Sequence, residues 1–225
     1  MFERLDLLIE KDNRKKLHTK TVVIIGVGGV GGYVVESLAR SGIGHLVLID
    51  YDVVDVTNKN RQLIAMDSTI GIKKIEVLKR RILDINPNCQ VDTHDTFLIE
   101  DNLSLLDNYK IDYLVDACDT VTTKKAIINK CLNNNILFIS SMGTGKRLDP
   151  SMLEITTLDK TSYDPIAKIL RKYVRDNKIN KKIKVLFSKE QPKKIESTTV
   201  ASACFVPNSA GLLIGSYIIR EFIKD

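Results

Sequence analysis

The segment at residues 22–52 constrains the fold more than any other part of the chain. An apolar run at residues 22–25 stops at a glycine-rich turn, a helical pattern covers residues 33–40, and a second apolar run at residues 46–49 leads to Asp50. Runs rich in β-branched residues are typical of strands buried on both faces of a sheet. Strand, glycine turn, helix, strand and acid together predict a nucleotide-binding βαβ unit. In such a unit the phosphates bind at the helix N-terminus and the acid binds the ribose.

The glycines of this turn follow a recognisable spacing. Gly26, Gly28 and Gly31 match the pattern G-x-G-x-x-G, and Gly29 lies in the same turn. Glycine permits a tight turn and lets backbone N–H groups approach a ligand closely. The pattern alone is a weak signal, because a turn that only connects two elements can also carry it. Its place between a strand and a helix, with an acid further on, indicates a site for an adenine nucleotide, either NAD or ATP.

Apolar runs and helical patterns alternate along the rest of the chain. Strands are expected at residues 89–93, 111–115 and 136–139, with helices at residues 72–83 and 122–133. This alternation is typical of an α/β fold of Rossmann-like type, in which a mostly parallel sheet carries helices on both faces.

The last third of the chain extends the same domain. Its expected elements are strands at 152–157 and 183–187, a helix that Asp164 caps and Pro165 begins, and a closing helix at 207–223 in which Gly211 and Gly215 allow close packing. No linker divides the sequence. We therefore expect a single domain, 1–225, made of a helical segment at 1–20, a nucleotide-binding core at 21–145 and a substrate-side extension at 146–225.

Charge and cysteine content limit the partners and the compartment. The formal net charge is +6 and the isoelectric point is about 9.0, which permits a polyanionic partner such as RNA. The longest apolar stretch, near residues 212–219, is too short to cross a bilayer, and the charged N-terminus has no signal-peptide core. The four cysteines include no C-x-x-C pair, which argues against a disulfide framework or a four-thiolate zinc site and favours a reducing cytoplasm.

Polar residues beyond the second apolar run favour adenylation over hydride transfer. Asn58, Arg61 and Gln62 lie in the loop after that run, Lys74 comes next, and Asp119 follows a later strand. Adenylation brings a carboxylate to the α-phosphorus of ATP, and preorganised cations with Mg²⁺ lower the barrier between the two anions. Each residue alone also has a plainer interpretation, a solvated charge or a helix cap. Their convergence at the carboxyl ends of the strands indicates an adenylating site.

Longer motifs support this interpretation. The chain resembles the ubiquitin-activating-enzyme-like (ThiF/MoeB/HesA) superfamily over residues 1 to about 145, through the motifs GVGGVG, IDYDxVxVTNxNRQ, GIKK and DACDT in their expected spacing. The resemblance implies that ATP and Mg²⁺ bind and that the chain forms a homodimer. It implies nucleotide contacts for Gly26, Gly28, Gly29, Gly31, Asp50, Asn58, Gln62 and Thr120, and catalytic roles for Arg61, Lys74, Asp119 (also the Mg²⁺ ligand) and Arg4, which would enter the partner subunit's site.

Later motifs are similar to one branch of that superfamily. SSMGTGxxLDP, KTSYDPIAKILR and FSKExP resemble the tRNA threonylcarbamoyladenosine dehydratases. The resemblance implies ATP-dependent cyclisation of the threonylcarbamoyl group on the tRNA adenosine next to the anticodon. Adenylation would activate the threonyl carboxylate, and the neighbouring carbamoyl group would close a five-membered ring and release AMP. No protein nucleophile is then required, and no histidine stands beside any cysteine.

Two other functions stay open at this stage. One is an adenylating activator of a small ubiquitin-like sulfur-carrier protein, and the other is an NAD-dependent oxidoreductase or nucleotide-binding regulator. The carrier activators commonly bind zinc through two C-x-x-C pairs, which this sequence lacks. Some relatives carry a cysteine near the position of Cys204 that takes part in sulfur relay with another protein. A buried core position is the favoured interpretation of Cys204.

The helix expected after Asp164 combines an apolar face with a basic one. Its apolar face holds Ile166, Ile169, Leu170, Tyr173 and Val174, and its opposite face holds Lys168, Arg171, Lys172 and Arg175. Lys178, Lys181, Lys182 and Lys184 continue the charge. A solvated surface and a tRNA-binding face account equally well for this pattern. The isolated His18, His45 and His94 are expected to be structural or surface residues.

Overall fold

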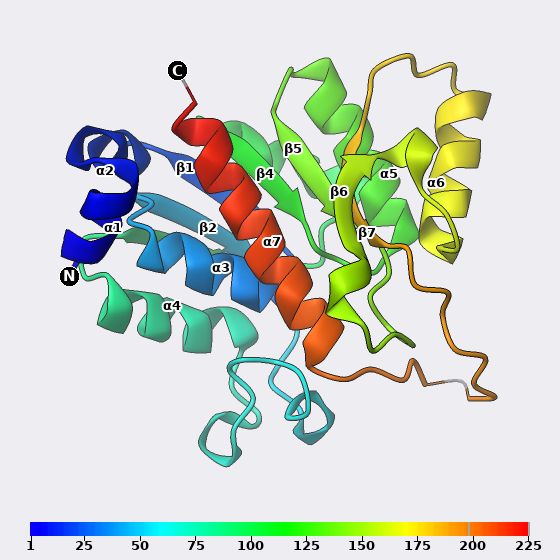
Figure 1. Cartoon of the computed structure of the whole chain (residues 1–225), viewed down its shortest axis with the longest axis horizontal. Coiled ribbons are helices and arrows are strands. Elements are labelled where there is room, and N and C mark those ends of the chain that lie inside the picture. Colours follow the sequence, from blue (N-terminus) through cyan, green and yellow to red (C-terminus); the bar gives the residue numbers. More distant parts are fainter. Residues whose placement is uncertain (198, 225) are drawn as a thin grey trace.

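Seven strands form one sheet in the order β3-β2-β1-β4-β5-β7-β6 (Figure 1). The computed structural model describes residues 1–197 and 199–224. The strands are β1 (Thr21–Ile25), β2 (His45–Ile49), β3 (Gln90–His94), β4 (Tyr113–Asp116), β5 (Phe138–Ser141), β6 (Leu153–Thr157) and β7 (Lys184–Ser188). All neighbouring strands pair in parallel except β6, which is antiparallel to β7. The predicted mostly parallel sheet is confirmed.

Helices cover both faces of this sheet (Figure 1). The α-helices are α1 (Glu3–Ile9), α2 (Lys11–His18), α3 (Gly31–Arg40), α4 (Lys74–Ile85), α5 (Val121–Asn133), α6 (Pro165–Asp176) and α7 (Phe205–Phe222). Short 3-10 helices are η1 (Val56–Asn58), η2 (Asp67–Thr69), η3 (Glu100–Asn108), η4 (Pro150–Met152) and η5 (Leu158–Lys160). Among the described residues, no helix is both long enough and apolar enough to cross a membrane.

The central strand β1 contributes to two separate hydrophobic cores. Val22 and Ile24 pack into the core beneath α3, α4 and α7, whereas Val23 and Ile25 pack into the core beneath η3, α5 and α6. Successive side chains of a strand point to opposite faces, so a strand covered on both sides must be apolar at every position. This requirement explains the uninterrupted run in the sequence.

Helix α7 lies against α3 with almost no space between the two backbones. A Cβ atom on Gly211 would lie 2.4 Å from the carbonyl oxygen of Val30, and one on Gly215 would lie 1.9 Å from Oγ of Ser37. The close packing predicted for these two glycines is confirmed. The contact ties the C-terminal helix to the first turn of α3, directly behind the glycine-rich turn (Figure 1).

The chain changes direction across the sheet between β1 and β4. From β1 it proceeds outward to β2 and β3, and it then returns to place β4 on the other side of β1. Ligands of open α/β sheets bind at such a switch point, beyond the carboxyl ends of the strands. The loops that follow β1, β2, β4 and β5 therefore meet at one edge of the sheet.

Three expectations about side-chain burial are corrected by the structure. Ile169, expected on the apolar face of α6, is 45% exposed, because this helix covers only the margin of the sheet and packs through Ala167 and Leu170. Arg171, expected on the opposite face, is half-buried and donates to the backbone carbonyl of Thr161. Cys204 is half-buried rather than buried, because it lies at the N-cap of α7, where the chain enters from an exposed segment.

Candidate active site

The glycine-rich turn joins β1 to α3 in a conformation that other residues would obstruct. Gly26 has a φ of +82°, and a Cβ atom there would lie 2.9 Å from the carbonyl of Ala117 in the loop after β4. A Cβ atom on Gly31 would lie only 1.9 Å from the carbonyl oxygen of Gly26. Gly31 therefore allows the helix to approach the strand and does not line the cavity described next, whereas Gly28 and Gly29 do.

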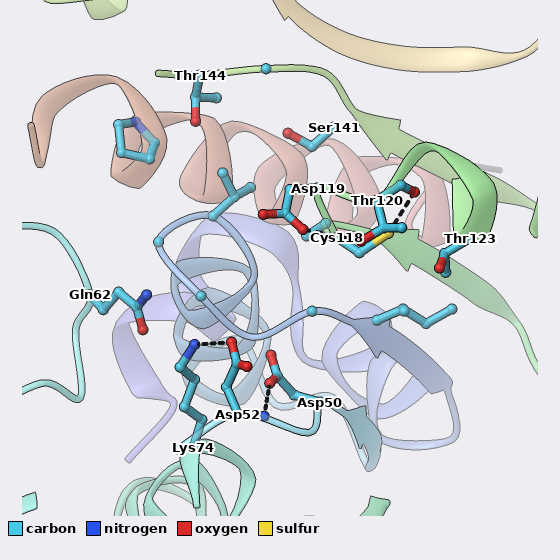
Figure 2. Close-up of a pocket in the computed structure, with 18 of the residues that line it drawn as sticks. Asp50, Asp52, Gln62, Lys74, Cys118, Asp119, Thr120, Thr123, Ser141 and Thr144 are labelled. Atoms are coloured by element: carbon cyan, nitrogen blue, oxygen red, sulfur yellow. Dashed lines mark hydrogen bonds and ion pairs between the residues drawn. The ribbon is translucent and has the colours of Figure 1, made fainter. Parts of the chain in front are cut away.

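A cavity of about 560 Å³ opens beyond the carboxyl ends of β1, β2, β4 and β5 (Figure 2). Of the twelve site residues predicted from the sequence, all except Arg4 and Gly31 belong to its lining: Gly26, Gly28, Gly29, Asp50, Asn58, Arg61, Gln62, Lys74, Asp119 and Thr120. Figure 2 shows Asp119 on one side of the cavity and Lys74, Asp52 and Gln62 on the other. The fold thus brings together polar residues that are far apart in the sequence.

Asp50, at the end of β2, holds two loops in place through its carboxylate. One oxygen accepts from the backbone N–H of Val27 at 2.7 Å, and the other accepts from the N–H of Asp52 at 2.8 Å (Figure 2). The carboxylate is buried and its orientation is set by these bonds. Each carboxylate oxygen has a second acceptor site, so the same group can also accept from ribose hydroxyls.

Lys74 begins α4 and extends its side chain into the cavity. Lys74 is only 5% exposed, and its Nζ donates to Oδ2 of Asp52 at 2.6 Å. Asp52 was not nominated from the sequence, although it lies in the quoted motif IDYD. The signal that could have identified it is its position two residues after Asp50, beside a lysine that must be paired to be buried.

The loop after β2 supplies two amides and a guanidinium. Asn58 uses Oδ1 to accept from the N–H of Asp55 at 3.2 Å, which leaves its amide nitrogen for a ligand. Gln62 is 8% exposed, and among the described residues its Oε1 has no hydrogen-bond partner. Arg61 donates through Nη1 to the carbonyl oxygen of Thr57 at 2.9 Å. A buried amide oxygen without a partner is costly, so Gln62 is suited to a ligand or water that donates to it.

Asp119 is exposed in the short loop between β4 and α5. The N-cap of α5 is Thr120, and no side chain forms a capping bond there, so Asp119 is not the helix cap. Its Oδ1 accepts from Oγ1 of Thr120 at 3.4 Å. No group of three or more potential metal-binding side chains occurs in the part of the chain that the structure describes. A single carboxylate fits Mg²⁺, which commonly binds one or two carboxylates together with substrate phosphates.

Lys124 was missed in the sequence although it supports the floor of the cavity. It is fully buried and donates to Oδ2 of Asp116 at 3.0 Å, Oγ of Ser140 at 3.2 Å and the carbonyl oxygen of Ser141 at 2.8 Å. These contacts connect α5 with the ends of β4 and β5. A lysine in register with Ile127 on the apolar face of a helix was the available signal.

Arg147 organises the opposite wall of the cavity and was also missed. This buried guanidinium donates to the carbonyl oxygen of Gly143 at 2.6 Å, that of Glu190 at 3.0 Å and Oδ2 of Asp164 at 3.5 Å. Asp164 in turn accepts from the N–H of Ala167 as the predicted N-cap of α6. The three motifs of the C-terminal extension therefore converge on one side chain.

Cys118 lies in the cavity wall and is unsuited to act as a nucleophile. Burial, followed by the nearby carboxylate of Asp116, raises the pKa of the Cys118 thiol well above its usual range. Its Sγ donates to Oδ1 of Asp116 at 3.0 Å. The thiolate is the reactive form of cysteine, so this environment suppresses its reactivity.

Arg4 does not line the cavity of its own subunit. It belongs to α1, a helix in which no residue is buried and in which Leu7 and Leu8 are 89% and 80% exposed. Its predicted role requires a second subunit and stays a prediction. The histidines are structural in character, since His45 contacts Asp92 at 3.0 Å and His94 contacts the hydroxyl of Tyr109 at 2.6 Å.

Comparison with known proteins finds relatives that match almost the whole chain. The model of the ThiF family matches residues 3–219. A tRNA threonylcarbamoyladenosine dehydratase of Bacillus subtilis is 39% identical over 241 residues, which cover 100% of this chain and 95% of that protein. A tRNA threonylcarbamoyladenosine dehydratase of Haemophilus influenzae is 44% identical over 174 residues, covering 77% of this chain and 67% of that protein.

A solved structure agrees with these relatives. The crystal structure of the tRNA N6-threonylcarbamoyladenosine dehydratase of E. coli in complex with ATP has a TM-score of 0.92 and 32% sequence identity to this chain. The match covers 99% of this chain and 93% of that one. The likeness therefore extends through the C-terminal extension as well as the nucleotide-binding core.

Proposed function

This chain belongs to the tRNA threonylcarbamoyladenosine dehydratases of the ThiF family, and we propose that it uses ATP to dehydrate threonylcarbamoyladenosine in tRNA. The observation that carries the proposal is the cavity at the switch point, where Asp119 lies opposite Lys74 beside the glycine-rich turn. The cavity combines cations, backbone N–H groups and a free carboxylate. These are the groups that a reaction at a phosphate requires.

ATP would bind with its ribose at Asp50 and its phosphates at the start of α3. Backbone N–H groups of Gly28 and Gly29 lie at this helix N-terminus, where the helix dipole favours negative charge. Tyr51 and Phe97 line the cavity next to Asp50, with their rings packed edge to face and their centroids 5.0 Å apart. Together with Leu98 they give the purine an apolar wall.

In the first step the threonyl carboxylate attacks the α-phosphorus, and the bond to pyrophosphate breaks. Lys74 and Arg61 would neutralise charge on the approaching carboxylate and the departing pyrophosphate. Asp119 would hold Mg²⁺ against the phosphates, and the ion would supply further positive charge there. Removing one such preorganised group commonly lowers the rate about 100-fold or more.

In the second step the carbamoyl group attacks the activated carbonyl carbon, and the bond to AMP breaks. The oxygen lost from the carboxylate leaves within AMP, so the nucleoside loses one water in total. Both reacting groups belong to one modification, so holding them close in the cavity supplies much of the acceleration. The wall at Ser141–Gly143, fixed by Lys124 and Arg147, would position them.

We also propose a cytoplasmic homodimer, in which Arg4 enters the site of the partner subunit. The exposed Leu7 and Leu8 beside it form an apolar surface on α1, of the kind that marks protein interfaces. A site shared between two copies would require a symmetric pair of such contacts.

Mass spectrometry of nucleosides tests this function. Purified tRNA that carries the threonylcarbamoyl group is incubated with the protein and Mg-ATP and then digested. We expect a nucleoside lighter by one water, formed together with AMP, and at least about 100-fold less of it with Lys74→Ala. A control with Lys59→Ala, an exposed lysine outside the cavity lining, should match the parent protein.

Two outcomes would contradict the proposal. Formation of ADP in place of AMP would mean phosphorylation rather than adenylation. Exchange of pyrophosphate into ATP that needs an added carrier protein and is indifferent to tRNA would indicate the sulfur-carrier function instead.

A further inference from the structure

The positive charge of the chain is concentrated in one segment, residues 158–184, which we call the basic face. This segment holds nine lysines and arginines and three aspartates, a net charge of +6. The whole chain also carries +6, from 34 basic and 28 acidic residues, so the remainder holds 25 of each sign. The rest of the protein is therefore neutral, and all of the excess charge lies around η5, α6 and the start of β7.

The acids of the basic face are already neutralised within the fold. Asp164 is buried against Arg147, Asp159 pairs with Lys182 at 2.9 Å, and Asp176 pairs with Lys172. Five of the cations have no carboxylate partner among the described residues: Lys160, Lys168, Arg171, Lys178 and Lys181. Lys184 lies over the ring of Tyr217 on α7, on the other side of the sheet. A cluster of cations without carboxylate partners is suited to a polyanion, because each phosphate contact releases counterions.

A cleft of about 310 Å³ lies within the basic face. Its floor is apolar and includes Leu158, Val174 and Ile183, and its rim carries Arg171, Arg175, Lys181 and Lys182. Among the described residues, Asp159 is the one carboxylate in its lining, and it accepts from Lys182. Unstacked RNA bases bind on apolar surfaces and guanidinium planes while cations contact their phosphates. The cleft offers both.

The basic face begins at the cavity where ATP would bind. Ile166, in the first turn of α6, lines that cavity, and Arg171, Val174 and Arg175, in later turns of the same helix, line the cleft. At 1.5 Å per residue, α6 extends for about 18 Å. A nucleotide held in the active site would therefore have its neighbours along this helix.

We propose that the basic face binds the substrate RNA and that its cleft receives an unpaired nucleotide next to the one being modified. The proposal rests on the function proposed above, because it takes tRNA as the substrate. It adds the surface on which that substrate lies.

Binding of fluorescently labelled tRNA at several salt concentrations tests the surface. The variant Arg175→Glu/Lys178→Glu is compared with Lys11→Glu/Arg80→Glu, which changes net charge equally on exposed residues of α2 and α4. We expect the first variant to bind about tenfold more weakly than the second at moderate salt. The slope of log Kd against log salt concentration should fall by about two. ATP affinity should stay at the parental value in both.

Arg175→Lys tests the cleft, because it keeps the charge and removes the planar group. We expect this variant to bind tRNA about fivefold more weakly if a base stacks on the guanidinium. Parental affinity would refute a nucleotide in the cleft. Equal tRNA affinity of the two charge-reversed variants would refute the basic face as an RNA-binding surface. That outcome would also be expected if this face bound an acidic protein instead.

The result can be separated from the proposed function. If the parent protein dehydrates tRNA while Arg175→Glu/Lys178→Glu binds as its control does, the function stands and the surface is wrong. If the parent binds ATP but neither binds nor modifies tRNA, both are wrong.

Discussion

Individual charged residues decide how the cavity holds its shape. Lys124 and Asp116 are both fully buried, and each satisfies the other at 3.0 Å. Arg147 joins three loops from the opposite wall. Neither cation was nominated from the sequence, because a single buried charge has no motif and becomes visible only when its partners are placed around it. A buried charge is tolerated only when it is paired and hydrogen-bonded.

Removing Lys124 should destabilise the protein more than it would on the surface. Lys124→Met leaves the carboxylate of Asp116 buried without its cation, and we expect the free energy of unfolding to fall by about 3–5 kcal/mol. Urea denaturation followed by circular dichroism measures the change. Lys124→Met/Asp116→Asn should recover part of the loss because it removes the stranded charge. A single variant as stable as the parent would contradict this account.

The thiol of Cys118 should stay unreactive at mildly alkaline pH. Burial raises its pKa, so the folded protein keeps the thiol protonated at a pH where a free cysteine, with a pKa of about 8.5, already ionises. At pH 8 we expect iodoacetamide to react with Cys118 at least about tenfold more slowly than it reacts with the thiol of free glutathione. Peptide mass spectrometry measures the rate at Cys118. Cys118→Ala should retain dehydratase activity. Rapid labelling of Cys118, or loss of activity in Cys118→Ala, would instead support a nucleophilic role for this cysteine.

At the scale of elements, local pattern predicted the order of strands and helices well. The run at residues 22–25, the helix behind the glycines and the cap at Asp164 all appear as expected. Burial on α6 was less predictable. Ile169 is exposed and Arg171 half-buried, because the width of a helix's buried face depends on what packs against it. Periodicity indicates a face but not its partner.

The contact between α7 and α3 should be sensitive to one methyl group. Gly211→Ala places Cβ against the backbone carbonyl of Val30, which cannot move without shifting the first turn of α3. We expect a loss of about 1–3 kcal/mol in the free energy of unfolding, even though alanine favours helix by about 1 kcal/mol. ATP affinity should also fall, since the proposed phosphate site lies at that turn. Calorimetry measures both quantities.

An exposed position on the same helix provides the control for this variant. Ser216→Ala should change stability by less than about 0.5 kcal/mol. If Gly211→Ala proved as stable as the parent, the close contact would not be a constraint on the fold.

At the scale of the whole molecule, the candidate nucleotide site lies at one edge of the sheet, and the excess positive charge lies in one segment, the basic face. Helix α6 belongs to both regions. Its first turn lines the cavity, and its later residues line the cleft of the basic face. Helix α1 lies apart from both, with its leucines exposed. A second copy of the chain is the partner that would bring Arg4 to a site.

Mixing two inactive variants tests whether Arg4 acts on the partner subunit. Arg4→Ala and Lys74→Ala should each be inactive as homodimers. Refolded together in equal amounts, they should regain about one quarter of the parental activity, because half of the dimers are mixed and each holds one complete site. Arg61→Ala mixed with Lys74→Ala should regain none, since both changes affect the subunit's own site. If the mixture of Arg4→Ala and Lys74→Ala also regained no activity, although native mass spectrometry showed mixed dimers, Arg4 would not act in the partner subunit's site.

The nucleotide-binding unit could be predicted from the order of residues because its determinants are local. A buried strand, a turn with glycine at fixed positions and an acid at the next strand end lie between residues 22 and 50, and each has its own steric or electrostatic requirement. The loop residues Asn58, Arg61 and Gln62, with Lys74, follow closely enough for the same strand end to place them.

Long-range packing decided the rest. Asp52 becomes the partner of Lys74, and Lys124 the partner of Asp116, only once separate elements meet. The same holds for Arg147, whose acceptors on Glu190 and Asp164 come from loops distant in the sequence and whose third acceptor, the carbonyl of Gly143, lies in its own loop. The energy of a buried charge depends on groups that surround it in space, and the linear sequence does not specify which groups those are.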